Sequence, residues 1–248
     1  MNKVLIFALL ASNIAFAQQP EKAVFQKEPI SFYQHTIVNS LKGEYDSTQK
    51  AKLKVDYGNR ELPTNPLLYK TVWYNNLLSQ GNTGTCWSFS TSSFMESEVQ
   101  RITGKEVDLS EMYTVYWEYV ERTKYFVQHK GDMHLGEGSE TNAIAKIMDL
   151  YGAVPFEAYT GQVNGLSFYN HEPMFEEIQA YFNLIKANNE WNEDKAVSKV
   201  KSILDKYIGK VPTVVTVNNR KMTPIQYRDY LKIQPKEYVN FMSLMEAP

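Results

Sequence analysis

The single cysteine of this 248-residue chain, Cys86, stands in the stretch QGNTGTCW, residues 80–87. A lone cysteine cannot form an internal disulfide, so it is a reactive thiol, one end of an intermolecular bridge, or an inert buried side chain. The local sequence favours the first, because a helix is predicted to begin at Cys86 and unpaired N–H groups at a helix N-terminus stabilise a thiolate. We therefore predict that Cys86 is a nucleophile.

Two further residues, both upstream of the thiol, belong to the candidate site. Gln80 lies six positions before Cys86, across a turn, so its side-chain amide can return to the thiol. Together with the Cys86 backbone N–H, this amide would donate to a developing oxyanion. Gly84 would let the backbone approach a substrate closely, because it has no side chain. These residue types indicate attack of a thiolate on a carbonyl group.

Such a reaction also needs a histidine that takes up the thiol proton and an asparagine that orients the histidine. None of the histidines stands in a setting that indicates this role, and all are interpreted as surface or loop residues: His35, His129, His134 and His171. Three asparagines are also interpreted as loop residues: Asn218, Asn219 and Asn240. The spacing of His129 and His134 is common in loops, so we predict no metal site and no cofactor.

Composition excludes two classes of protein. Hydrophobic residues make up 43% of the chain and charged residues 22%, which is typical of a folded globular protein and not of a disordered one. The formal net charge is −2 and no basic block stands out. Nucleic-acid binding therefore has no electrostatic footprint in this sequence.

Residues 1–17 are predicted to be a signal peptide. Lys3 gives a short positive region, an apolar run follows from Val4 to Phe16, and small residues flank a cleavage position after Ala17. The alternative is an N-terminal anchor that stays uncleaved. We expect an exported protein, periplasmic or extracellular, with no membrane segment in its mature form.

The elements that must position the thiol are predicted to be helices. Apolar residues recur at helical spacing after Cys86, and Gly104 occupies the place of a helix C-cap. Ser110 is a good N-cap for a second helix. A glycine-rich loop, residues 131–139, precedes a third helix over 141–151.

The flanking regions differ in character. Residues 18–70 are predicted to be an extended segment with one short strand or helix. The C-terminal region is predicted to contain helices around residues 175–185, 193–208 and 225–231, and a β-type run over 211–217.

The site resembles that of the papain-like cysteine peptidase family. That family has the signature Cys-Gly-[Ser/Ala]-Cys-[Trp/Tyr], whose last four positions read Gly84-Thr85-Cys86-Trp87 here. Thr83 replaces the first cysteine, which forms a disulfide in the family. The stretch Leu109–Tyr113 is similar to the start of the family's next helix, and its Met-Tyr ending is closest to the bleomycin hydrolase and aminopeptidase C branch.

The resemblance implies an α+β, papain-like fold, mainly the helical nucleophile lobe, with the β-rich second lobe largely missing. It assigns residues 71–165 to that lobe and 166–248 to a helical insertion and the start of the second lobe. The residues that it implies for the site are catalytic Cys86 and Gln80, with substrate-binding Gly84, Trp87, Gly138 and Ser139.

The expected function is that of a cysteine peptidase that acts on peptides, and the resemblance implies an aminopeptidase of the bleomycin hydrolase type. We expect the chain to be truncated before the catalytic histidine and asparagine of the family. The resemblance also implies that copies of the chain associate into a homo-oligomer. The alternative is a catalytically inactive papain-like module that binds peptides or proteins.

Overall fold

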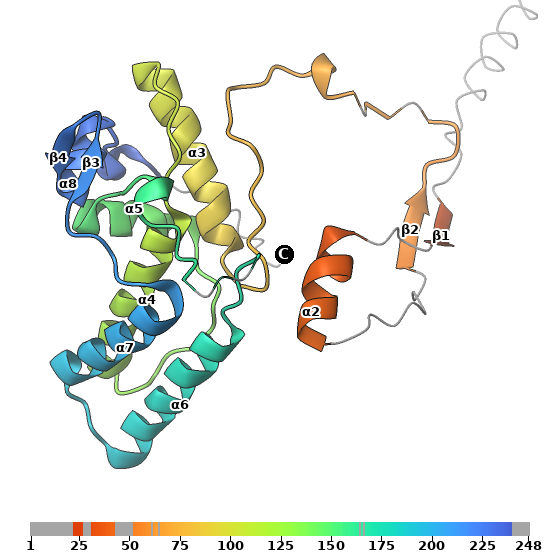
Figure 1. The fold of residues 1–248 in the computed structure, drawn as a ribbon. Helices are drawn as coiled ribbons and strands as arrows, with labels where there is room; N and C mark the ends of the chain where they lie inside the picture. The colour runs from red at the N-terminus through yellow and green to blue at the C-terminus, as the bar shows by residue number, and fades with distance from the viewer. Residues whose placement is uncertain are drawn as a thin grey trace, which may run out of the picture. The chain divides into compact units, whose positions relative to one another are not determined.

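A computed structural model describes residues 22–26, 31–42, 52–60, 62–63, 65–163, 165 and 167–239. The chain forms two compact units, residues 1–70 and 71–248, and each is described by itself (Figure 1). The predicted signal peptide and Asn240 lie outside the described residues. Within the described part, no helix is long and apolar enough to cross a membrane.

The first unit contains an antiparallel pair of strands. Strand β1 (Lys22–Gln26) pairs with β2 (Lys52–Asp56), and a π-helical segment (Tyr33–Val38) leads into α2 (Asn39–Lys42). The sequence predicted one short strand or helix here. It missed the second strand because Phe25 and Leu53 are exposed, so neither strand has an alternating pattern of buried residues.

The second unit is mainly helical. Its helices are α3 (Cys86–Thr103), α4 (Glu111–Gln128), α5 (Thr141–Tyr151), α6 (Glu172–Asn188), α7 (Glu193–Ile208) and α8 (Pro224–Tyr230). Two short strands, β3 (Val215–Val217) and β4 (Arg220–Met222), form an antiparallel hairpin. The described part of the chain therefore has an α+β composition with few and small strands.

Local capping signals explain the helix ends. The Ser110 hydroxyl accepts a hydrogen bond from the Tyr113 N–H, 3.1 Å away, which confirms its role as the N-cap of α4. Gly104 ends α3 in the left-handed conformation, as predicted. The predicted β-type run is shorter than expected: only Val215–Val217 forms a strand, because its partner β4 is three residues long.

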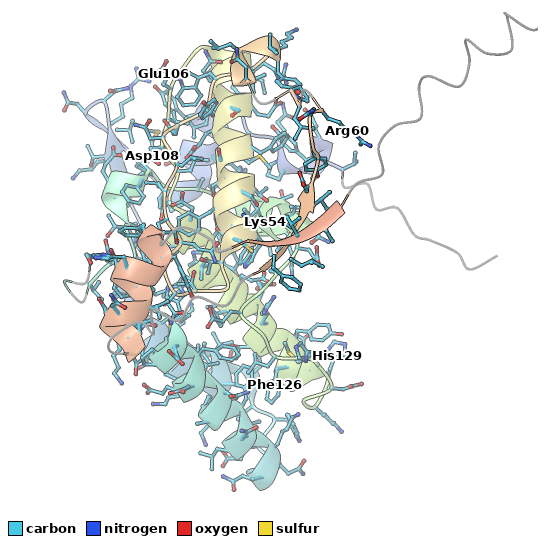
Figure 2. All side chains as sticks on the ribbon, turned by 90° about the vertical axis from the view of Figure 1, so that its right-hand side faces the viewer. Lys54, Arg60, Glu106, Asp108, Phe126 and His129 are labelled. Atoms are coloured by element: carbon cyan, nitrogen blue, oxygen red, sulfur yellow. The ribbon has the colours of Figure 1, made fainter. Side chains whose placement is uncertain are left out.

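Helix α4 is the centre of the core. It packs against α3, α5 and α7, and it contributes eleven of its residues to the buried interior. Near its C-terminal end, where Figure 2 labels Phe126, α4 contacts α6. The Phe126 ring stacks on Phe182 of α6, with ring centroids 4.1 Å apart. The packing of α3 against α4 fixes the helix end that carries Cys86.

Candidate functional site

Cys86 is the first residue of α3, and its side chain is exposed. The N-cap residue, Thr85, makes no side-chain cap hydrogen bond. The first turn of α3 is held instead by the Ser88 hydroxyl, which donates to the Glu111 carbonyl oxygen of α4 at 2.9 Å. The structure therefore presents the thiol to solvent at the positive end of an 18-residue helix.

Gln80 is fixed in the loop that leads to this helix. Its Nε2 atom donates to the Thr83 carbonyl oxygen at 2.6 Å, and the Thr83 hydroxyl donates back to the Gln80 carbonyl oxygen at 2.9 Å. A glutamine amide carries two hydrogens on nitrogen, so this bond uses one of them. Gln80 thus has a defined position five residues before the helix N-cap, Thr85, with one donor left for another acceptor.

A segment far along the chain holds the same loop. The Asn82 N–H donates to the Tyr169 carbonyl oxygen at 2.8 Å, and the His171 N–H donates to the Asn82 carbonyl oxygen at 3.1 Å. The Asn82 side-chain amide also donates to the Asn170 side-chain oxygen at 2.9 Å. No local sequence signal predicts this bridge, because 88 residues separate its two sides.

Glu137 contacts two residues of the signature. Its carboxylate accepts a hydrogen bond from the Gly84 N–H at 2.5 Å, and its carbonyl oxygen accepts one from the Trp87 indole N–H at 3.3 Å. Burial raises the pKa of Glu137, the Gly84 N–H opposes this rise, and the charge of Glu172 adds to it. Trp87 is only 5% exposed and belongs to the hydrophobic core.

The space beside Gly84 is filled by Glu137. A Cβ atom at position 84 would lie 2.5 Å from the Glu137 Cβ atom, closer than two carbon atoms can pack. The structure therefore supports a packing role for the small residue at position 84, in addition to the close approach to substrate that we predicted.

Replacing Gly84 by alanine is expected to destabilise the fold by about 1–3 kcal/mol, the usual cost of overpacking. The new methyl group would displace Glu137 and weaken its bond with the backbone N–H of residue 84. Thermal unfolding measured by circular dichroism checks this. The matched control is Gly138→Ala, since a Cβ there would meet no atom within 4 Å. Equal melting temperatures for the two variants would contradict the packing role.

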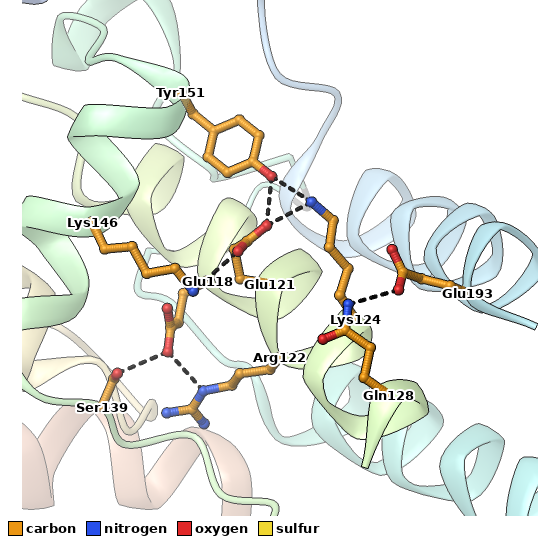
Figure 3. Close-up of polar contacts among 9 residues, drawn as sticks. All are labelled: Glu118, Glu121, Arg122, Lys124, Gln128, Ser139, Lys146, Tyr151 and Glu193. Atoms are coloured by element: carbon orange, nitrogen blue, oxygen red, sulfur yellow. Dashed lines mark hydrogen bonds and ion pairs between the residues drawn. The ribbon is translucent and has the colours of Figure 1, made fainter. Parts of the chain in front are cut away.

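The loop that contains Gly138 and Ser139 is anchored to α4 (Figure 3). The Arg122 guanidinium donates to the carbonyl oxygens of Gly136 and Gly138, and its Nε atom lies 2.9 Å from a Glu118 oxygen. The Ser139 hydroxyl donates to the same Glu118 oxygen at 2.8 Å. Glu118 and Arg122 lie one helical turn apart, so a single face of α4 holds the loop.

The histidines of the second unit have other surroundings. The His129 ring stacks on Tyr125, and its Nδ1 atom is 2.9 Å from the Tyr125 carbonyl oxygen. His171 is 1% exposed, neither ring nitrogen has a hydrogen-bond partner, and burial lowers its pKa to about 4. His134 lies beside Gly136. None of these three makes a hydrogen bond with the Cys86 thiol among the described residues.

Sequence reasoning missed three residues that support the site: Glu118, Arg122 and Glu137. Each is an ordinary charged residue in its local sequence, and each acts through a contact that the fold creates. No group of three or more histidine, cysteine, aspartate or glutamate side chains that could hold a metal ion occurs within the described ranges.

Comparison with known proteins identifies the family. The sequence profile of the Peptidase C1-like family matches residues 49–232. The chain is also similar to aminopeptidase C of Lactobacillus delbrueckii subsp. lactis, with 23% identity over 139 residues, which cover 49% of this chain and 29% of that protein. The chain thus spans under a third of that relative's length. Since the profile extends over more than half of the chain, on both sides of Cys86, this protein belongs to the Peptidase C1-like family.

Proposed function

We propose that this chain is the helical, nucleophile-bearing part of a papain-like cysteine peptidase of the aminopeptidase type. The observation that carries the proposal is the exposed Cys86 thiol at the first residue of α3, inside the region that matches the peptidase family. The similarity to aminopeptidase C supports peptides with a free amino terminus as the substrate class.

In the proposed reaction, the Cys86 thiolate attacks the carbonyl carbon of the scissile bond and forms a carbon–sulfur bond. The Cys86 backbone N–H and the remaining Nε2 hydrogen of Gln80 donate to the carbonyl oxygen as it becomes negative. The carbon–nitrogen bond then breaks, and the leaving amine takes up the thiol proton through a histidine of the kind that the family resemblance implies, a role in which no hydrogen bond places His129 or His171. Water hydrolyses the thioester and restores the thiol.

Gly138 and Ser139 are proposed to position the substrate main chain. Open space beside Gly138 supports this role, because a peptide can approach the backbone there without meeting a side chain. The bonds from Arg122 and Glu118 support it further, since they hold the loop rigid before substrate binds.

A second candidate function is peptide binding without catalysis. It is favoured by the surroundings of the thiol, since no histidine of the described second unit is hydrogen-bonded to Cys86. Without a base, proton transfer to the leaving amine is lost, and this transfer typically contributes about 10²–10⁴-fold to the rate.

Hydrolysis of coumarin amides under reducing conditions distinguishes the two functions. We expect slow hydrolysis of aminoacyl substrates by the purified full chain and less hydrolysis of dipeptidyl substrates with a blocked amino terminus. A preference for the blocked substrates would contradict the aminopeptidase type. Binding of the same peptides with no hydrolysis above the buffer background would support the second candidate.

A further inference from the structure

A cavity of about 460 Å³ lies between residues 75–78, α3 and the segment that leads into α4, and Cys86 does not line it. Its lining contains three carboxyl groups, from Glu96, Asp108 and Glu111, and two leucines, Leu77 and Leu78. Glu96 and Glu111 are almost fully buried, whereas Leu77 is 92% exposed. The cavity therefore has an acidic interior and an apolar rim.

The carboxyl groups differ in their hydrogen bonds. Glu96 is satisfied on both oxygens: the Leu109 N–H donates to one at 2.7 Å, and the Asn75 side-chain amide donates to the other at 3.0 Å. Glu111 is 4% exposed, and its Oε2 atom has no hydrogen-bond partner among the described residues. A buried acceptor without a partner destabilises the folded protein, so a donor that enters the cavity and reaches this oxygen would remove that cost.

Among the described groups that act on the Glu111 carboxyl, none is positively charged. Burial, opposed by a hydrogen bond from the backbone of Glu111 itself and assisted by the charges of Glu96 and Asp108, raises the pKa of Glu111 to about 8. In the part of the chain that the structure describes, the titratable groups that interact with Glu111 are these two carboxyl groups and the phenol of Tyr169. All of them are neutral or negative, so the cavity has a field that attracts a cation.

We propose that this cavity binds a primary alkylammonium group, with the ammonium donating to Glu111 and the alkyl stem lying against Leu77 and Leu78. An ammonium ion is a compact charge with three donors, which suits the single free oxygen of Glu111. A guanidinium needs two parallel acceptors, and Glu111 offers one. The apolar rim matches the methylene stem that a lysine side chain or a free alkylamine carries.

Binding is coupled to loss of a proton. At pH 7 the empty cavity holds Glu111 mainly in its protonated form, because its pKa is about 8. An ammonium ion beside it favours the carboxylate, so each binding event releases up to about one proton, and affinity rises as the pH approaches 8.

Isothermal titration calorimetry of the full chain tests the proposal with two matched pairs of probes. The first pair is n-butylammonium chloride and n-butanol. The second is Nα-acetyl-lysine methylamide and Nα-acetyl-norleucine methylamide, which has the stem without the charge. We expect the charged member of at least one pair to bind with proton release, which is measured in buffers of different ionisation enthalpy. The neutral member of that pair should bind at least roughly tenfold more weakly. Tighter binding of the lysine derivative assigns the site to a polypeptide lysine, and tighter binding of butylammonium assigns it to a free amine.

Glu111→Gln is the critical variant, and Glu106→Gln is its control. Glu106 is exposed in the same α3–α4 segment as Asp108 and does not line the cavity (Figure 2). We expect Glu111→Gln to weaken ammonium binding roughly tenfold or more and to abolish proton release, and Glu106→Gln to preserve both.

The critical variant should fold. Because the pKa of Glu111 is raised on folding, ionised Glu111 destabilises the native protein progressively from about pH 4.5 to about pH 8. Glu111→Gln removes this cost, so its melting temperature at pH 8 should equal or exceed that of the original chain. Equal affinity for charged and neutral probes, or unchanged ammonium binding by a folded Glu111→Gln variant, would overturn the proposal.

Discussion

Replacing Cys86 by alanine is expected to lower hydrolysis of aminoacyl coumarin amides at least about 10³-fold, to the buffer background. The variant has no thiol, and the alternative nucleophiles on α3 are serine and threonine hydroxyls, which stay protonated without an adjacent base. The helix should remain intact, because the exposed Cys86 side chain contributes little to packing. Initial rates at several substrate concentrations measure the loss.

Ser90→Ala is the control for this variant. Ser90 lies one turn further along α3, its hydroxyl is exposed, and it donates to the Trp87 carbonyl oxygen at 3.3 Å. We expect its rate to stay within about twofold of the original, since an exposed side-chain change of this kind is nearly neutral. Hydrolysis that survives in Cys86→Ala, or that disappears equally in both variants, would contradict a thiol nucleophile.

Replacing Gly152 by alanine is expected to destabilise the second unit by about 2–5 kcal/mol. Gly152 ends α5 with a φ of 80°, a backbone conformation that raises the conformational energy of any residue with a side chain. A Cβ atom there would also collide with backbone atoms of Pro224 and Ile225, and backbone cannot rotate away as a side chain can. The next residue, Ala153, donates to the Pro224 carbonyl oxygen at 3.1 Å, so the strain would reach the docking of α8 on α5.

Gly104 offers a matched comparison. It ends α3 with a φ of 71°, but a Cβ atom there would meet nothing within 4 Å. Gly104→Ala should therefore cost only the conformational part, about 1–2 kcal/mol. Differential scanning calorimetry should show a melting temperature for Gly152→Ala that is lower than that of Gly104→Ala by several degrees. Equal losses would mean that α8 does not pack against the end of α5 as described.

The sequence predicted helices where local signals coincide. The predicted bounds of α5 and α7 agree with the structure, since apolar periodicity and caps such as Gly152 mark both ends. Helix α6 is longer than the predicted 175–185, because Pro173 at its start and Asn189 in a left-handed C-cap extend it beyond its apolar stripe. The sequence pattern did not predict the pairing of strands β1 and β2, since it joins residues far apart in the chain.

In the candidate site, too, the features that depend on local sequence could be predicted and those that depend on tertiary contacts could not. The position of Cys86 at a helix start could be predicted, because it depends on residues 80–87 alone. The carboxylate on Gly84, the arginine under Gly138 and the bridge from Asn82 to Asn170 could not, because each joins segments that meet only in the folded protein. Local sequence therefore places Cys86 at a helix start, and tertiary contacts determine how the loop before it is held.

Covalent labelling at neutral pH with an epoxide of the kind that traps papain-like thiols tests the central claim most directly. Mass spectrometry of the folded full chain should show one adduct, on Cys86, formed faster than on a cysteine peptide of the same local sequence. Faster labelling is expected because the exposed thiol lies at the positive N-terminal end of α3. A folded chain that stays unmodified while the unfolded chain reacts would contradict the claim that Cys86 is the nucleophile.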